Sequence, residues 1–229
     1  MGILAKIKKV SYDLMESAVR NIGGGIGERI RYRLYKSRFK SCGVNVKFGI
    51  GVSIVAPECV TIGDNVWIDD YCILIAGMPP TFSGREVRRF KNDHYDGENG
   101  HLVIGCGVHI APFCLVNAFG GGISIGDYCA LASGVKMYSM TNLSKSNSHP
   151  SKITYCNPMV KHRPVVVAIS PIVLGQNCLI ALNATILGGS VGKDSSVSPY
   201  SLVVGNFGAN STISGNPAMR IGERFEDYK

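Results

Sequence analysis

Aliphatic side chains recur at every sixth position in four stretches of the chain. The first begins at Ile62 (IGDNVW-IDDYCI-LIAG), and the others begin at Ile104, Ile125 and Leu174. A six-residue period fits neither an α-helix nor one long strand. It is typical of a parallel β-solenoid, in which each hexad supplies a short strand and a corner and three hexads complete a coil. The pattern therefore predicts an all-β solenoid for most of the chain.

Strand alternation adds a second set of inward positions, two residues before each aliphatic residue. Free cysteine commonly behaves as a small buried hydrophobe, so this set accounts for half of the 8 cysteines. No CxxC pair and no secretory signal are present, so we favour neither a disulfide framework nor a metal site. The inward positions are occupied by Val66, Cys72, Val108, Cys114, Cys129, Val135, Cys178 and Ala184.

The N-terminal segment has a different pattern, with apolar residues at spacings of three and four from Ile3 through Val10 and Leu14 to Ile22. This spacing predicts an amphipathic helix that ends at Gly23. We expect residues 1–42 to form a basic helical arm and residues 43–229 to form the solenoid domain. We favour packing of the apolar stripe on the solenoid or on a partner subunit. The alternative is that residues 1–40 lie peripherally on an anionic membrane surface.

The formal net charge of +8 changes the interpretation of that arm. Residues 1–42 contain ten Lys or Arg and three Asp or Glu, so they carry +7 of it. The rest of the chain is nearly balanced, which argues against a nucleic-acid groove across the solenoid. No apolar run approaches the roughly 18 to 20 residues of a membrane span. We therefore expect a cytoplasmic protein, with contact to the inner face of the membrane as the alternative for its arm.

The five histidines are the first candidates for a general base, because imidazole titrates near neutrality. His109 directly precedes Ile110, so alternation turns its side chain outward on a flat face. Aligning the coils places Trp67, the single tryptophan, directly beneath His109. An aromatic side chain beside a base can orient a sugar or a pantetheine arm. The alternative is that both are packing residues at an interface between subunits.

Two interruptions of the hexads, at residues 78–100 and 140–164, are expected to be loops. Insertions into a solenoid commonly build its binding face. The first interruption carries Arg88 and His94, whose polar side chains suit an acceptor such as a sugar.

From Gly43 to Phe225 the chain resembles the hexapeptide-repeat acyltransferases, and among them the sugar O-acetyltransferases of polysaccharide biosynthesis. The resemblance is carried by the coils quoted above, by ALASGVKMYS at residues 130–139 and by the closing ISGNPAMRIGERF at residues 213–225. It implies a left-handed parallel β-helix, a homotrimer, acetyl-CoA as co-substrate and active sites between neighbouring subunits. We expect no required metal, because the positions below and above His109 in the neighbouring coils are Trp67 and Ala130 and supply no further histidine.

In many of these relatives a catalytic histidine follows soon after the segment that matches VKMYS. This chain has Asn142 there, and an asparagine cannot act as a general base. His149 lies seven residues later, and a longer loop can return it to the same cleft. Another branch of similar enzymes offers His109 instead. We favour His109 as the catalytic base, keep His149 as its rival, and assign Asn142 to orienting the substrate, with turn capping as the alternative.

Similar enzymes thread pantetheine along a groove between C-terminal coils, using backbone amides and small side chains. The resemblance places a phosphate contact near the closing segment, where Arg220 is the candidate. The expected donor-site residues are Ser133, Ala181, Asn183, Gly188, Asn216, Pro217 and Arg220.

The sequence therefore predicts an enzyme that moves an acetyl group from acetyl-CoA to a hydroxyl of a sugar in surface polysaccharide biosynthesis. Acetylation of a sugar amine is one alternative. The other is a non-catalytic trimeric solenoid that serves as a scaffold or binding protein, which Asn142 would explain.

Overall fold

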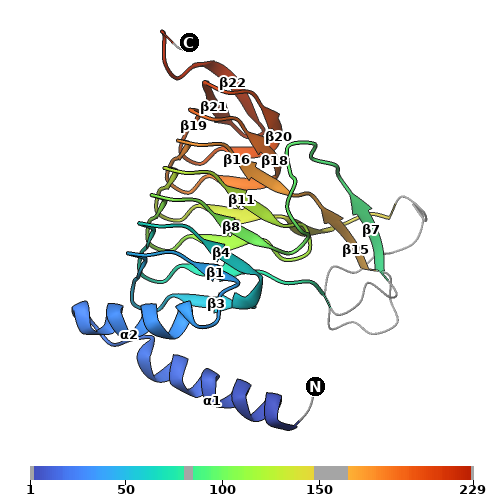
Figure 1. The fold of residues 1–229 in the computed structure, drawn as a ribbon. Coiled ribbons are helices and arrows are strands. Elements are labelled where there is room, and N and C mark those ends of the chain that lie inside the picture. The colour runs from blue at the N-terminus through green and yellow to red at the C-terminus, as the bar shows by residue number, and fades with distance from the viewer. Residues whose placement is uncertain (1–2, 80–84, 147–164, 228–229) are drawn as a thin grey trace.

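A computed structural model describes residues 3–79, 85–146 and 165–227 of the chain. Short parallel strands wind into a column of stacked coils, with two helices beneath its N-terminal end and an antiparallel hairpin at its C-terminal end (Figure 1). This coiled parallel sheet confirms the predicted all-β solenoid and is consistent with the left-handed β-helix that the resemblance implies.

The first face of the column is built by the strand that opens each coil. Ile62 pairs with Ile104, Ile104 with Ile125, and Ile125 with Leu174, so the register predicted from the repeats is confirmed. A short 3₁₀ helix, η1 (Pro57–Cys59), precedes the second coil. The strands of this face are β1 (Ser41–Cys42), β4 (Val60–Ile62), β8 (Leu102–Ile104), β11 (Ile123–Ile125) and β16 (Ile172–Leu174).

The second face carries Trp67 and His109. In the described residues it is an 8-stranded sheet, whose last strand is antiparallel to its neighbour and closes the column. Its members are β2 (Lys47–Phe48), β5 (Trp67–Ile68), β9 (His109–Ile110), β12 (Ala130–Leu131), β17 (Leu179–Ile180), β19 (Ser196–Val197), β21 (Ser211–Gly215) and β22 (Ala218–Glu223).

The third face is joined to the first by two longer strands that turn the edge between them. One end of β18 pairs with β13 and the other end pairs with β16. The strands are β3 (Ser53–Val55), β6 (Ile73–Ile75), β10 (Leu115–Asn117) and β13 (Lys136–Tyr138), and the edge-turning pair is β18 (Thr185–Val191) and β20 (Leu202–Phe207).

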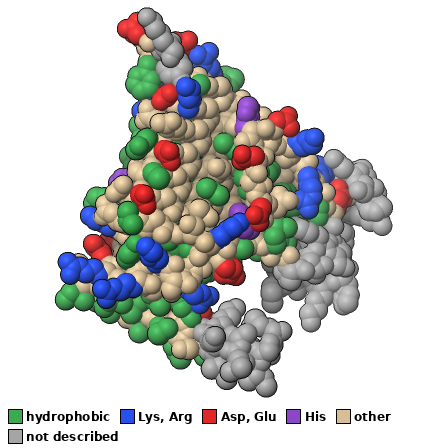
Figure 2. Space-filling model, viewed as in Figure 1, with side chains coloured by type: hydrophobic (Ala, Val, Ile, Leu, Met, Phe, Trp, Pro, Cys, Tyr) green, Lys and Arg blue, Asp and Glu red, His purple; other side chains and the backbone are tan. Residues whose placement is uncertain are grey.

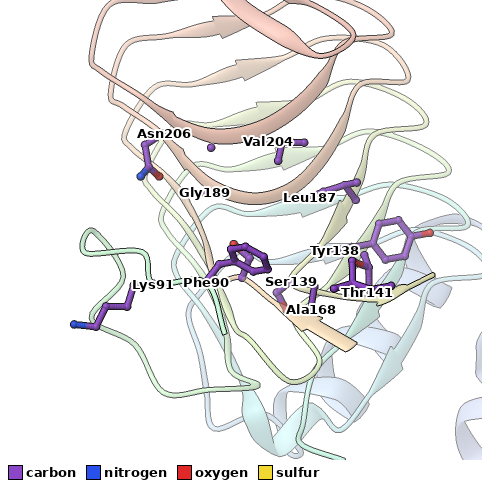
Figure 3. A pocket seen from close by; sticks show the side chains of 13 residues that line it. Phe90, Lys91, Tyr138, Ser139, Thr141, Ala168, Leu187, Gly189, Val204 and Asn206 are labelled. Atoms are coloured by element: carbon purple, nitrogen blue, oxygen red, sulfur yellow. The ribbon is translucent and has the colours of Figure 1, made fainter. Parts of the chain in front are cut away.

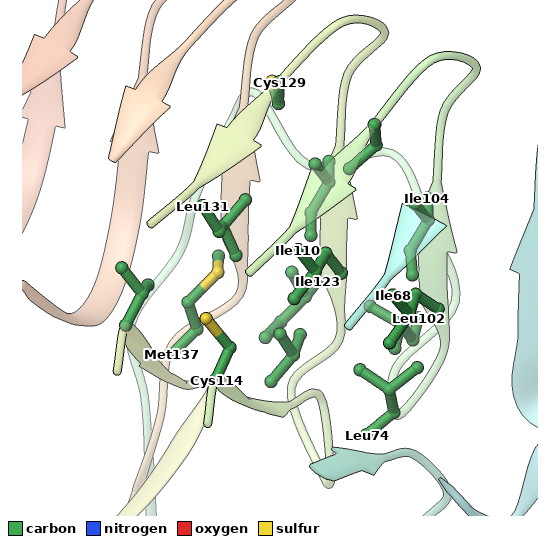
Figure 4. Close-up of a cluster of buried hydrophobic side chains, with 14 of the residues drawn as sticks. Ile68, Leu74, Leu102, Ile104, Ile110, Cys114, Ile123, Cys129, Leu131 and Met137 are labelled. Carbon is green, nitrogen blue, oxygen red and sulfur yellow. The ribbon is translucent and has the colours of Figure 1, made fainter. Parts of the chain in front are cut away.

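The core is the space inside the coils, filled by one ladder of side chains from each face (Figure 4). Ile68, Ile110 and Leu131 follow one another in adjacent coils and are fully buried. The small inward positions are buried as predicted, including all four cysteines assigned to them. Their thiols donate to corner carbonyls of neighbouring coils, as Cys114 Sγ does to Ala132 O at 3.1 Å. Cysteine at these sites thus packs as a hydrophobe and satisfies a corner carbonyl.

The corners require left-handed backbone conformations, which asparagine and glycine adopt most readily. Asn65 (φ 56°) and Asn183 (φ 57°) are such corner residues. Aromatic residues occupy others: Tyr71 and Phe113 both have positive φ, and their exposed rings stack with centroids 5.5 Å apart. The hexad pattern did not predict aromatic side chains at these corners.

Both interruptions of the repeat contain strands, so the expectation of loops there is wrong in part. β7 (Arg85–Arg89) pairs with β15 (Val165–Ile169), and β15 pairs with β14 (Met140–Leu143), giving a 3-stranded sheet within the described residues. β15 is rich in β-branched residues and Val165, Val166 and Val167 are buried, which favours a strand. The two interruptions therefore fold together beside the column.

The N-terminal helices are α1 (Ile3–Val19) and α2 (Gly24–Lys36). Of the two packing sites expected for the apolar stripe of the first helix, the solenoid is wrong for the described side chains, and packing on a partner subunit stays a prediction. Val10 and Leu14 are 58% and 68% exposed, whereas Tyr12 and Glu16 are buried. The reason is a polar contact: Tyr35 of α2 donates to Glu16 at 3.3 Å. The division of the chain at residue 43 stays a prediction.

Leu131→Ala should lower the free energy of unfolding by about 2–5 kcal/mol, because it leaves a cavity among fully buried side chains. Urea denaturation followed by circular dichroism measures this. Leu182→Ala is the matched control, because Leu182 is 50% exposed at a corner, and a change within about 0.5 kcal/mol is expected there. Equal losses in the two variants would contradict the assigned core.

Candidate functional site

His109 stands on the second face between Trp67 of the preceding coil and Ala130 of the next. Its Nε2 atom lies 2.8 Å from Oδ2 of Asp69. The His109 side chain is 45% exposed and that of Asp69 is 21% exposed. A carboxylate in this position fixes the orientation of the imidazole, and it leaves Nδ1 to exchange a proton with a ligand. The outward placement of His109 predicted from the sequence is confirmed.

Asp69 is the residue at this site that the sequence analysis missed. Its backbone amide donates to Ile110 O at 2.8 Å, which holds it at the corner where β5 ends. Asp69 lies two residues after Trp67, so strand alternation turns both side chains to the same face. The pairing of Ile68 with Ile110 places Ala111, and not His109, at the position that follows in register with Asp69, so the carboxylate reaches His109 diagonally. Alternation applied to the coil beneath His109 would have found it.

Trp67 forms an aromatic wall against His109, as the stacking of coils predicted. The ring centroids are 5.3 Å apart with an interplanar angle of 40°. Lys47 of the first coil lies over the other side of the indole, 5.1 Å from a ring centroid. Trp67 is still 49% exposed. The column therefore presents a cation, an aromatic ring, an imidazole and a carboxylate as one open surface of the second face.

Three of the expected donor-site residues lie along the edge at which Asp69 stands. This edge joins the second face to the third, and it continues through Ala111 to Ser133, Ala181 and Asn183 in later coils. Ala111 N donates to Leu131 O and Ala181 N to Val197 O, which fixes the coil spacing. Neighbouring strands lie about 4.8 Å apart, so Ala181 stands about 10 Å from Ala111. A long thin ligand could follow this edge from Asn183 to the His109 imidazole.

A pocket of about 350 Å³ lies at the edge that the second face does not touch. The 3-stranded sheet of the interruptions forms one wall of it, and β18 and β20 form another. In Figure 3, Phe90, Ser139 and Ala168 lie on one side of the pocket and Leu187 and Val204 on the other. A cavity of this size suits a small organic ligand.

The structure separates two groups of residues that the sequence analysis had assigned to one site. Asn142 lies in β14 between two residues that line the pocket, Thr141 and Leu143, and no described histidine lines that pocket. Arg88 of β7 donates to Lys145 O at 3.0 Å, so it fastens the sheet of the interruptions. The pocket and the His109 surface therefore lie on different sides of the column.

The remaining expected contacts lie apart from His109. Gly188 is buried within β18, where a Cβ would overlap the side chain of Ser170. His94 is exposed and borders a second hollow near β16 and β20. Asn216, Pro217 and Arg220 belong to the closing hairpin, and Arg220 pairs with Glu223 at 3.4 Å. His149, the rival base, lies outside the described residues.

Among the residues that the structure describes, no group of three or more His, Cys, Asp or Glu side chains could hold a metal ion. The chemistry available at the His109 surface is proton transfer. An imidazole held by a carboxylate can accept a proton from a nucleophile, and the adjacent indole can bind an apolar or planar part of a ligand.

The comparisons with known proteins agree with this architecture. No family model matches the chain. It is 26% identical over 193 residues to dTDP-4-amino-4,6-dideoxy-D-glucose acyltransferase from Escherichia coli, with 84% of this chain and 86% of that protein covered. A mutant of AntD, an N-acyltransferase from Bacillus cereus in complex with dTDP and coenzyme A, superposes with a TM-score of 0.67 at 22% identity, covering 86% of this chain and 90% of AntD.

A hexapeptide-repeat-containing acetyltransferase from Vibrio cholerae O1 biovar eltor, in complex with acetyl coenzyme A, superposes with a TM-score of 0.52 at 15% identity. The alignment covers 99% of this chain and 93% of that protein. These three proteins are named as acyltransferases or acetyltransferases, one of them for a dTDP-linked amino sugar and one as an N-acyltransferase. The resemblance to hexapeptide-repeat acyltransferases, identified from the coil motifs, is confirmed.

The pocket depends on two glycines with positive φ, Gly189 and Gly205. A Cβ on Gly189 would overlap the carbonyl oxygen of Gly205, whereas a Cβ on Gly205 meets nothing within 4 Å. Gly205→Ala should therefore cost only the backbone strain, about 1–2 kcal/mol. Gly189→Ala should cost about 1–3 kcal/mol more, because backbone must shift. Urea unfolding of both variants measures the difference, and equal losses would contradict the close approach of β18 and β20.

Proposed function

We propose that this chain, like the hexapeptide-repeat acyltransferases it resembles, transfers an acyl group from a CoA thioester, acetyl-CoA among them, to a sugar. The observation that carries the proposal is the outward imidazole of His109, held by Asp69 at 2.8 Å and walled by Trp67. An inert solenoid face needs no such arrangement. The homology to acyltransferases supports the same reaction class.

The edge from Asp69 to Asn183 suits the donor. Pantetheine is a thin chain, and the small, half-buried side chains of Ala111, Ser133 and Ala181 make this edge narrow and accessible to such a chain. Coenzyme A and acetyl coenzyme A are ligands of the similar structures from Bacillus cereus and Vibrio cholerae. We place the thioester at the His109 end of this edge and the nucleotide toward the C-terminal coils.

The first candidate acceptor is the amine of a nucleotide-linked amino sugar. It is supported by the Escherichia coli relative, which is named for a dTDP-linked amino sugar, and by AntD, which is an N-acyltransferase that binds dTDP. The exposed indole of Trp67 offers a stacking surface for a planar ring of such an acceptor.

With an amine acceptor the chemical step forms an amide, and a hydroxyl would follow the same course to an ester through a C–O bond. The acceptor nitrogen attacks the thioester carbonyl, a C–N bond forms, and the tetrahedral intermediate is stabilised by amide N–H groups. His109 takes the proton that the nitrogen loses, and the C–S bond then breaks. The departing sulfur receives that proton, which yields the amide and free CoA.

The second candidate is the one predicted from the sequence, acetylation of a sugar hydroxyl in surface polysaccharide biosynthesis. The observation that favours it is the His109–Asp69 pair. A hydroxyl is a far weaker nucleophile than a neutral amine, so it depends more on a positioned base. For either acceptor, the proposal includes an assembly of three subunits. In such an assembly a neighbouring subunit can place the edge that carries its pocket against the exposed His109 surface, which would complete the site.

Acyl transfer measured with acetyl-CoA against paired acceptors separates the two candidates. Each pair contains an amino sugar and its hydroxy analogue, as free sugars and as nucleotide-linked sugars, and release of CoA thiol is followed. We expect turnover with the nucleotide-linked amino sugar. Turnover confined to hydroxyl acceptors would favour the second candidate, acetylation of a sugar hydroxyl. Absence of acetyl-CoA binding in calorimetry would favour the non-catalytic scaffold.

His109→Ala should lower kcat by about 10²–10⁴-fold, the usual contribution of a general base, while acetyl-CoA binding persists. His101→Ala is the matched control, because His101 also pairs with a carboxylate, that of Glu98 at 3.1 Å, but lies on a different segment. Retention of wild-type kcat by His109→Ala would contradict the assignment of the base.

Asp69→Asn tests the positioning role of the carboxylate. Because the pair is partly exposed, its loss should remove about 1 kcal/mol, or about fivefold in kcat, with KM little changed. Steady-state kinetics measures both parameters. Asp69→Glu should recover part of the rate, whereas a merely structural role predicts equal losses in the two variants and a changed KM.

A further inference from the structure

The helices beneath the column are turned so that their apolar side faces away from it. Val10, Leu14 and Met15 of α1 are 58%, 68% and 49% exposed. Of the α1 side chains that the structure describes, the buried ones are Tyr12, an aromatic residue with a phenol group, and Glu16, a carboxylate. Amphipathic helices that cover a core have the reverse orientation, with the apolar stripe inward.

Buried polar contacts fix this orientation. Arg31 of α2 is 1% exposed, and its guanidinium donates to Phe48 O at 2.9 Å and to Ile22 O at 2.6 Å. It therefore ties the end of the α1 segment to the first coil of the solenoid. Glu16 Oε1 is also 2.6 Å from Arg20 Nη2, an ion pair within the α1 segment. Turning α1 about its axis would break the contact between the buried Tyr35 phenol of α2 and Glu16 Oε1, which lie 3.3 Å apart, and this loss is unfavourable.

Tyr12 belongs to the same buried cluster. The guanidinium of Arg38 lies 3.7 Å from its ring centroid. Burial raises the pKa of Tyr12 to about 12, so its phenol is neutral at physiological pH. Specific contacts thus occupy the side of α1 that packs on the protein. The apolar stripe of the helix therefore stays exposed.

The outer side of α2 extends this surface and adds charge. Ile26, Arg29, Ile30 and Arg33 follow at spacings of three, one and three residues, which places them on one helical face. All four are exposed. In Figure 2, hydrophobic side chains gather along the lower left edge of the molecule, over these helices, and Lys and Arg side chains lie beside them.

Apolar side chains beside excess basic charge complement a surface that is both apolar and anionic. A lipid headgroup layer has this character, because its acyl boundary takes apolar side chains and its phosphates take Lys and Arg. Residues 1–42 carry a net charge of +7 by sequence. A second copy of this chain would present the same positive charge to it, so charge disfavours self-association through this surface.

We propose that the outer surface of α1 and α2, defined by Val10, Leu14, Ile26, Arg29, Ile30 and Arg33, binds the anionic surface of a lipid bilayer. The helices lie in the interface and do not span it. Among the described residues, no helix has both the length and the apolarity that a transmembrane span needs. The column of coils then stands with its N-terminal end on the membrane. This proposal is independent of the acyl acceptor.

Vesicle sedimentation with the full chain tests it. Vesicles of phosphatidylcholine with 30 mol% phosphatidylglycerol, a composition chosen as the probe, are compared with pure phosphatidylcholine vesicles. We expect binding to the anionic vesicles that weakens as NaCl rises from about 50 to 500 mM. Absence of binding to anionic vesicles, or equal binding to both, would overturn the proposal.

Two paired variants locate the surface. Arg29→Gln with Arg33→Gln should weaken binding about thirtyfold, because each basic side chain near such a surface contributes about 1 kcal/mol. Leu14→Gln with Ile26→Gln should weaken it at least about tenfold. The matched control is Leu182→Gln with Ile221→Gln, which changes exposed apolar residues distant in the fold from the helices. Equal effects in control and test variants would contradict the assigned surface.

The variants alter exposed side chains, so their thermal unfolding midpoints should match that of the wild type. Sedimentation velocity supplies the second readout. If the wild type ignores vesicles and Leu14→Gln with Ile26→Gln dissociates an oligomer, the surface is an interface between copies of this chain and the lipid proposal is wrong.

Discussion

The parallel stacking of short strands at a fixed register is the constraint on which the rest of this structure depends. Each coil places its residues directly over those of the coil before, so a side chain that points outward meets a partner one coil away. Lys47, Trp67 and His109 form one such outward ladder, while Phe48, Ile68 and Ile110 form the inward one. The buried hydrophobic ladder fixes the register of the coils, and that register places Lys47, Trp67 and His109 side by side in the candidate site.

The sequence predicted most of the solenoid because a six-residue period determines both the strands and their stacking. The period and alternation alone placed Ile110 and Cys114 inside and His109 beside Trp67, and the structure confirms each of these. The donor edge was found only through the resemblance. Its residues Ser133, Ala181 and Asn183 lie together along one edge of the column, and their roles stay predictions.

What the sequence did not predict arises from contacts that no period encodes. Asp69 reaches His109 diagonally between coils. The sheet of β7, β14 and β15 joins β7 to segments that follow it after two intervening coils, and it places Asn142 beside a pocket away from His109. The outward turn of α1 depends on the contact of Glu16 with Tyr35 of α2. Each of these features depends on a side chain that reaches a neighbouring element or on a pairing between strands that are distant in sequence.

The most direct test of the account is a structure of the assembled protein with CoA and an acceptor analogue. The account predicts that the CoA sulfur lies at the Asp69 end of the edge that leads to Asn183. It also predicts that the acceptor nitrogen or oxygen lies about 3 Å from the free nitrogen of the His109 imidazole. Two observations together would contradict the account. The CoA sulfur would lie in the pocket beside Ser139 and Thr141, and no His109 from a neighbouring subunit would lie near it.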